Sequence, residues 1–168
     1  MRIFVLLAAF ALAAFLPACG FQLRGTAALP FDTLYMPPTT TTGIALDLKR
    51  NIQSGTRTRV VDDPKLAEAV LEFAQEAREK HILSLAATGR VREFQLRYRV
   101  AFRVHDGKGS EFLPLSTVQL TRDVTFNDTE VLAKETEEQL LYRDMQFDMV
   151  QQIMRLIAAA QRPKPAAQ

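Results

Sequence analysis

The fold is decided by the stretch QLRYRVAFRV, residues 95–104. Its even-numbered residues are all apolar, whereas its odd-numbered residues are glutamine, alanine or arginine. A period of two is typical of a strand with one face buried and the other in water. The stretch therefore predicts a half-buried strand with a basic outer face. Its apolar residues are Leu96, Tyr98, Val100, Phe102 and Val104.

The residues after this strand predict a hairpin. The run Asp106-Gly107-Lys108-Gly109 has turn composition, because glycine adopts positive φ angles without steric cost. Residues 113–126 then supply a returning strand, with the apolar residues Val118, Leu120, Val124 and Phe126 on one face. Together they indicate a long antiparallel ladder.

Two amphipathic helices are predicted from apolar residues at helical spacing. The first covers residues 44–53 and ends at Ser54-Gly55. The second covers residues 130–160, and we interpret its methionines as helix core rather than as an adaptable binding surface. The apolar residues are Ile44, Leu48 and Ile52 in the first helix, and Leu141, Met145, Met149, Ile153 and Ile157 in the second.

The segment before the central strand is ambiguous. Ala67, Val70 and Leu71 begin a helical period over residues 66–85, and alternate positions fit a strand less well. Pattern and propensity alone therefore favour a helix here. Shorter β-prone runs are expected at residues 34–36 and 57–61, each followed by proline.

The N-terminus has the composition of a secretory signal peptide. Arg2 precedes an apolar run from Ile3 to Leu16, which would form a helix of about 21 Å at 1.5 Å per residue. A bilayer core of about 30 Å is too thick for this run to span easily. We expect residues 1–18 to be removed.

Cys19 is the predicted site of lipid attachment, through S-diacylglycerol and N-acyl groups. It is the only cysteine of the chain and follows Leu16 and Ala18 in lipobox order, although Pro17 is atypical there. A thiolate is a strong nucleophile, and an unpaired thiol is a liability in an oxidising compartment. The alternative is an ordinary signal peptide with an incidental cysteine. Residues 19–160 are predicted to form one α/β domain, and residues 161–168 a disordered tail.

The composition gives little support for catalysis. Neither histidine, His81 or His105, has ligand-like neighbours, and each is interpreted as a surface or loop residue rather than a metal ligand. Hydrolase, zinc-protease and P-loop spacings are absent from the sequence. Asp62-Asp63 and Glu137-Glu138 are interpreted as solvated or capping carboxylates. We therefore expect a non-enzymatic protein that needs neither cofactor nor metal.

Charge indicates no nucleic-acid partner, because the formal net charge is only +2 and falls further when Arg2 leaves with the leader. The basic strand face has two open interpretations. It is either a solvated surface or a site for anions such as a phosphorylated lipid head group. Its arginines are Arg90, Arg92, Arg97, Arg99 and Arg103.

Several runs of sequence resemble one known family. Residues 19–25 read CGFQLRG, residues 122–128 read RDVTFND, and residues 131–134 read VLAK. An acidic helix start and a long amphipathic helix follow. In this order they resemble the lipopolysaccharide-assembly lipoprotein family LptE, over most of residues 19–160.

The resemblance implies an α+β fold, a two-layer sandwich of a small, mainly antiparallel or mixed sheet with two helices packed on one face. It also implies that residues 68–84 form a strand paired with residues 91–104, against the helix that the pattern favours. The family's protein lies largely inside the lumen of the LptD barrel in the outer membrane. There it supports barrel assembly, binds lipopolysaccharide and helps deliver it to the outer leaflet.

By the same resemblance, we expect an outer-membrane lipoprotein that is lipid-anchored, faces the periplasm and reaches into the barrel lumen; Gly20 after the cysteine also favours the outer membrane. Lys134 matches a basic position that the family associates with lipopolysaccharide. The family's other basic position, at the tip between the long strands, falls near Ala86–Gly89, which is not basic here; Arg90 or Arg92 is a candidate substitute. The alternative function is an accessory or structural lipoprotein subunit of another outer-membrane barrel machine.

The substitution Cys19→Ser is predicted to abolish acylation, because a hydroxyl cannot replace the thiol as acceptor. The domain should then leave the membrane fraction unless a barrel retains it. Fractionation and mass spectrometry of the N-terminal peptide measure both effects. A fully acylated, membrane-bound variant would contradict the lipobox assignment.

Overall fold

The computed structural model describes residues 28–37, 43–125 and 131–162, without the side chains of residues 131–133. Five strands, two α-helices and one short 3₁₀ helix, Pro64–Leu66, follow one another along these ranges. The strands are β1 (Thr33–Tyr35), β2 (Arg59–Val61), β3 (Ala69–Leu85), β4 (Val91–His105) and β5 (Glu111–Thr125), and the α-helices are α2 (Gly43–Gly55) and α3 (Val131–Ala159).

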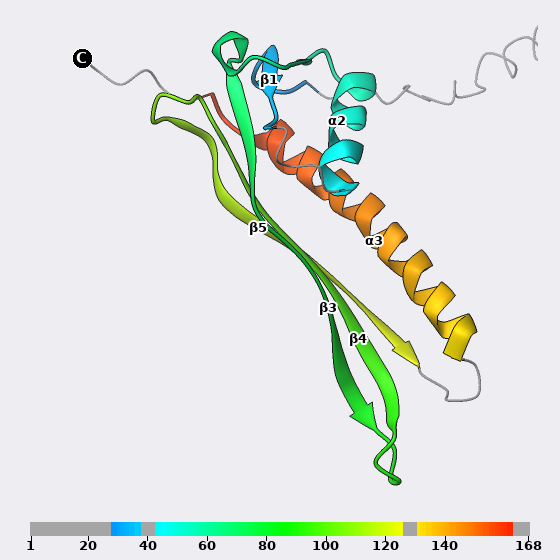
Figure 1. The fold of residues 1–168 in the computed structure, drawn as a ribbon. Helices are drawn as coiled ribbons and strands as arrows, with labels where there is room; N and C mark the ends of the chain where they lie inside the picture. The colour runs from blue at the N-terminus through cyan, green and yellow to red at the C-terminus, as the bar shows by residue number, and fades with distance from the viewer. Residues whose placement is uncertain (1–27, 38–42, 126–130, 163–168) are drawn as a thin grey trace, which may run out of the picture.

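The strands form one mixed sheet in the order β2-β1-β3-β4-β5. The short strand β1 is parallel to both β2 and β3, whereas β3, β4 and β5 form a long antiparallel ribbon. Figure 1 shows β1, β2 and α2 together at one end of this ribbon, and the β3–β4 hairpin at the other. This is the expected α+β class.

The core lies between the two helices and the inner face of the sheet. Leu96, Tyr98, Val100, Phe102 and Val104 are all fully buried, as their alternation predicts. From the helices, the predicted apolar stripes meet them and are confirmed as core. These stripes are Ile44, Leu48 and Ile52 in α2, and Met145, Met149, Ile153 and Ile157 in α3.

The helix favoured by pattern over residues 66–85 is wrong, and the strand implied by the family resemblance is confirmed. Residues 69–85 form β3, which pairs with β4 along its whole length. A register shift between Phe73 and Gln75 moves the inner face to even-numbered residues. From there the inner positions are Glu76, Arg78 and Lys80, so charged side chains replace the apolar alternation that would have marked a strand.

The remaining elements lie close to their predicted bounds. The expected helix 44–53 is α2, the expected helix 130–160 is α3, and the hairpin between β4 and β5 turns at residues 106–110. Gly107 and Gly109 have φ angles of 71° and 105°, which explains glycine at these turn positions. Phe126, predicted for the inner face, lies outside the described residues.

We predict that Ile153→Ala destabilises the domain by about 2–5 kcal/mol, because it empties a fully buried site in α3. The matched control is Leu156→Ala on the same helix, whose side chain is 37% exposed and should cost less than about 1 kcal/mol. Urea unfolding midpoints measure both. Equal losses would mean that α3 is not held by this apolar face.

Candidate functional site

A polar seam holds the far half of β3 beside α3. The guanidinium of Arg78 lies 4.8 Å from the ring centroid of Tyr98 and 5.6 Å from that of Tyr142, and it donates to Gln146 at 2.5 Å. Tyr142 also donates its hydroxyl proton to the backbone oxygen of Glu79 at 2.9 Å. Cation–π contacts of this kind contribute about 0.5–1 kcal/mol at exposed sites. These contacts attach strand to helix where apolar packing ends.

Within the seam, Tyr98 donates its hydroxyl proton to Oε1 of Glu76 at 2.6 Å. Burial, reinforced by this carboxylate, raises the pKa of Tyr98 above its usual range. Burial likewise raises the pKa of Tyr142, with Glu138 adding to the shift. Both phenols therefore stay protonated at neutral pH and act as donors rather than as acid–base groups.

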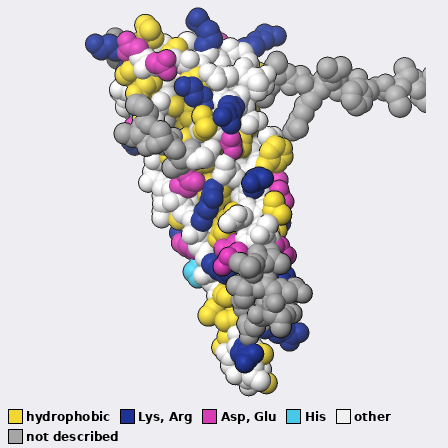
Figure 2. All heavy atoms as spheres, turned by 45° about the vertical axis from the view of Figure 1, so that its right-hand side comes forward, with side chains coloured by type: hydrophobic (Ala, Val, Ile, Leu, Met, Phe, Trp, Pro, Cys, Tyr) yellow, Lys and Arg dark blue, Asp and Glu magenta, His cyan; other side chains and the backbone are white. Residues whose placement is uncertain are grey.

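Beyond the seam, the β3–β4 hairpin projects as an exposed tip, defined here as residues 82–92. Its turn is closed by hydrogen bonds from Ala86 N to Arg90 O and from Gly89 N to Ala86 O. Ile82, Leu83 and Leu85 are 59%, 49% and 57% exposed, values that are unusual for large aliphatic side chains. Figure 2 shows hydrophobic and basic side chains gathered at this lower end of the molecule.

The structure places the predicted site residues as follows. Arg90 and Arg92 both lie at exposed positions of the tip. Lys134 lies in the first turns of α3, at the same end of the molecule (Figure 1), with its side chain only 19% exposed and its Nζ 2.7 Å from Glu137. Cys19 lies outside the described residues.

Lys80 is a basic residue of this region that sequence reasoning missed. Its Nζ lies 4.3 Å from the ring centroid of Phe94 and 2.5 Å from Oε2 of Glu138 on α3. The signal was hidden by the helical interpretation of its segment. On a strand, Lys80 and Ile82 share the inner face with Phe94 opposite. This end of the molecule thus combines apolar side chains with cations.

The basic outer face of β4 carries acidic partners from β3, which sequence reasoning also missed. Arg103 donates to Oε2 of Glu72 from Nε at 2.9 Å and from a terminal nitrogen at 2.6 Å. Arg97 and Arg99 approach Oε2 of Glu79 at 3.6 and 3.9 Å. The face is therefore largely charge-compensated. Both glutamates could have been found once β3 was known to be a strand paired with β4.

These pairings set the acidity of the two glutamates. The hydrogen bonds from Arg103 lower the pKa of Glu72 despite a smaller opposing effect of desolvation. His81, whose Nε2 lies 2.9 Å from Oε2 of Glu79, lowers the pKa of that carboxyl most, followed by Arg99 and Arg97. Both histidines thus lie on strands beside a carboxylate, because His105 Nε2 is 3.4 Å from Oε1 of Glu72.

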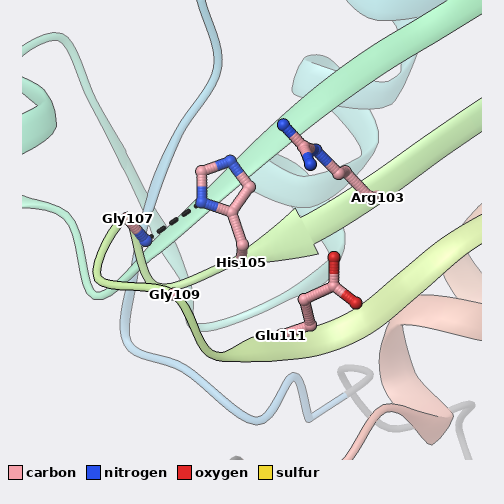
Figure 3. A pocket seen from close by; sticks show the side chains of 5 residues that line it. All are labelled: Arg103, His105, Gly107, Gly109 and Glu111. Atoms are coloured by element: carbon pink, nitrogen blue, oxygen red, sulfur yellow. Dashed lines mark hydrogen bonds between the residues drawn. The ribbon is translucent and has the colours of Figure 1, made fainter.

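A second hollow lies at the opposite end, beside the β4–β5 turn. Figure 3 shows its lining residues, with His105 Nδ1 accepting a hydrogen bond of 3.0 Å from Gly107 N. The backbone N–H groups of Lys108 and Ser110 both donate to Asp106 and lower its pKa. These contacts stabilise the turn. The lining residues are Arg103, His105, Gly107, Gly109 and Glu111.

Two further findings apply to the described ranges. No three His, Cys, Asp or Glu side chains gather there in an arrangement that could hold a metal ion. Among the same residues, neither helix has the length and apolarity needed to cross a membrane.

Comparison with known proteins identifies related chains. The family model LptE, described as lipopolysaccharide-assembly, matches residues 31–157. A solution structure of an uncharacterized lipoprotein B from Nitrosomonas europaea is 45% identical, with a TM-score of 0.72, over 83% of this chain and 91% of that one. No curated protein sequence matches.

Two crystal structures share the fold at lower identity. The rare lipoprotein B from Shewanella oneidensis is 24% identical, with a TM-score of 0.66, over 76% of this chain and 94% of that one. A minor lipoprotein from Acinetobacter baumannii is 23% identical, with a TM-score of 0.65, over 82% of this chain and 99% of that one.

Proposed function

We propose, from the premise that this chain belongs to the LptE family of lipopolysaccharide-assembly proteins, that it is a non-enzymatic lipoprotein that plugs an LptD-like barrel in the outer membrane. In this role it supports assembly of the barrel, binds lipopolysaccharide and helps deliver it to the outer leaflet. The family match over residues 31–157 carries the proposal. It establishes a role in lipopolysaccharide assembly, and the barrel and the lipid contacts are the proposed refinements.

The surface of the domain supports a position inside a barrel lumen. The lumen side of a membrane barrel is polar, whereas its outer side faces lipid. The outer sheet face meets that requirement, because its arginines are paired with Glu72 and Glu79 and few apolar side chains interrupt them. A charge-compensated polar face can lie against a polar wall without leaving buried charges unpaired.

The tip supports lipopolysaccharide binding. Its exposed residues Ile82, Leu83 and Leu85 offer apolar contact, and Arg90 and Arg92 offer guanidinium groups beside them. Guanidinium binds phosphate through two parallel hydrogen bonds, while aliphatic side chains suit acyl chains. The combination fits an amphiphile whose phosphates adjoin its hydrocarbon.

Lys134 would be a second cationic contact at this end, near the start of α3. Its Nζ is held by Glu137, so an anionic ligand has to compete with that carboxylate. Exposed pairs of this kind contribute only about 0–1 kcal/mol, which a phosphate can replace.

A lipid anchor on Cys19 would keep the domain beside the barrel. Each buried CH₂ of an acyl chain contributes about 0.8 kcal/mol, and two or more chains give stable attachment. Confinement to the membrane also raises the effective concentration of the domain for a barrel in the same membrane. The proposed protein spans residues 19–160 as one domain after removal of residues 1–18.

The first test is a mild-detergent pull-down of the tagged mature protein from outer membranes. A near one-to-one complex with an LptD-like barrel is expected, and mass spectrometry with native-mass analysis measures it. Recovery without a barrel, or with an unrelated one, would contradict the plug assignment and support an accessory lipoprotein of another machine.

The second test reverses two charges at the tip end, in the double variant Lys134→Glu/Arg90→Glu. We expect purified lipopolysaccharide to bind about tenfold more weakly, which corresponds to 1.4 kcal/mol. The difference should shrink at high salt, because ions screen exposed charges. The matched control Arg57→Glu/Lys65→Glu changes net charge equally at exposed positions far from the tip. Equal affinities for both variants would remove the tip end from the binding surface.

A further inference from the structure

The outer edge of β5 is a long row of backbone groups without a neighbouring strand. Within the part of the chain that the structure describes, β5 pairs only with β4 and ends the sheet. A strand exposes alternate N–H and C=O groups along an unpaired side. Over the length of Glu111–Thr125, this edge extends about 50 Å at 3.3–3.4 Å per residue. It is long enough to template an added strand.

This edge has few of the features that usually prevent strand addition. Charged side chains, prolines, bulges and short length protect natural edges. Residues 112–121 of β5 contain no charged residue and a single proline, Pro114 near one end. Leu115 is 62% exposed, and Arg122, the next charged residue toward the helix, is paired with Asp148 at 3.2 Å.

The opposite edge of the same ribbon is well protected. Beyond Val70, β3 has no strand on its outer side among the described residues, since its pairing with β1 ends there. That edge carries two kinds of protective feature, charged side chains and register shifts at Phe73/Gln75 and Ile82/Ser84. Its charged residues are Glu72, Glu76, Arg78, Glu79 and Lys80. Two edges of one ribbon therefore differ in exactly the property that controls pairing.

We propose that the β5 edge is a β-strand addition site, occupied in the working complex by an extended segment of the barrel partner. The proposal rests on the proposed function, because it names that barrel as the source of the strand. An added strand would satisfy the free backbone groups of β5, and main-chain hydrogen bonds would supply most of the recognition.

The chemistry of the occupant follows from β5. A closed barrel wall uses its strand edges on one another, so the segment comes from a loop or terminus outside the wall. Its side chains on the inner face would lie beside Leu113 and Leu120, which are only partly buried, and are expected to be apolar. On the outer face they would meet Thr117 and Gln119, so polar uncharged residues fit there.

Amide hydrogen exchange of the full mature chain tests the proposal, measured alone and in the purified barrel complex. Alternate amides of residues 113–121 should become protected in the complex, whereas the edge amides of residues 75–81 in β3 serve as an internal control for the same surroundings. Equal protection of both edges would indicate general exclusion of water and overturn the proposal.

Other outcomes are also decisive. A barrel complex whose β5 amides exchange as in the free chain would overturn strand addition and leave the proposed function intact. Absence of any barrel would overturn both. Protection of the free chain that grows with its concentration would indicate pairing with a second copy, and would also overturn the proposal.

A charged edge provides an independent check. The variant Leu115→Glu/Thr117→Glu places two carboxylates at exposed β5 positions, and Ala74→Glu/Gln75→Glu places them at exposed positions of β3. We expect the β5 variant to recover several-fold less barrel and to lose the edge protection, and the β3 variant to behave as the parent. Exchange of the core amides confirms that both variants fold. Full recovery of barrel and edge protection by the β5 variant would contradict the proposal.

Discussion

Packing of α3 across the inner face of β4 and β5 is the interaction on which the rest of the structure depends. The central strand supplies a continuous row of fully buried side chains from Leu96 to Val104, and α3 covers it with Met145, Met149 and Ile153. Burial of each such side chain contributes roughly 1.5–3 kcal/mol. With one cysteine in the chain no internal disulfide can form, so this layer has to hold the fold.

The helical layer is shorter than the sheet that it covers. A helix of 29 residues extends about 44 Å at 1.5 Å per residue, whereas the 17 residues of β3 extend about 56 Å. The hairpin therefore runs past the helix (Figure 1). Apolar packing gives way first to the seam of Arg78, Tyr98 and Tyr142, and then to the exposed tip. The region available for ligand binding is thus the part of the sheet that the core leaves uncovered.

Sequence reasoning located the elements whose side chains are buried by period and lost those whose side chains face a polar seam. The alternation of residues 95–104 and the four-residue repeat of α3 both predicted their structures, because one side of each packs against apolar atoms. The failure at β3 has a physical cause. After the bulge its inner residues Glu76, Arg78 and Lys80 find polar partners on Tyr98, Gln146 and Glu138, so burial no longer selects apolar residues.

The candidate site was predicted only in part for the same reason. Arg90 and Arg92 were found as residues, but the apolar tip beside them depends on β3 being a strand, and Lys80 was hidden with it. The compensation of the outer face was equally invisible, because it joins Arg103 to Glu72 across 31 positions of sequence. A resemblance to a family supplied what local pattern could not, since it carries the pairing of strands that are distant in the chain.

The two edges of the ribbon have different environments to satisfy. An edge that must stay monomeric in water needs charge or distortion, and β3 has both. Protection of β5 would be a disadvantage if that edge is to be paired, because each charge placed there must be desolvated when a strand is added. An anchored protein meets few copies of other edges before it meets its partner in the same membrane, so the lipid on Cys19 would reduce the need for protection. Anchor, polar outer face and open edge then become parts of one arrangement for assembly with a barrel.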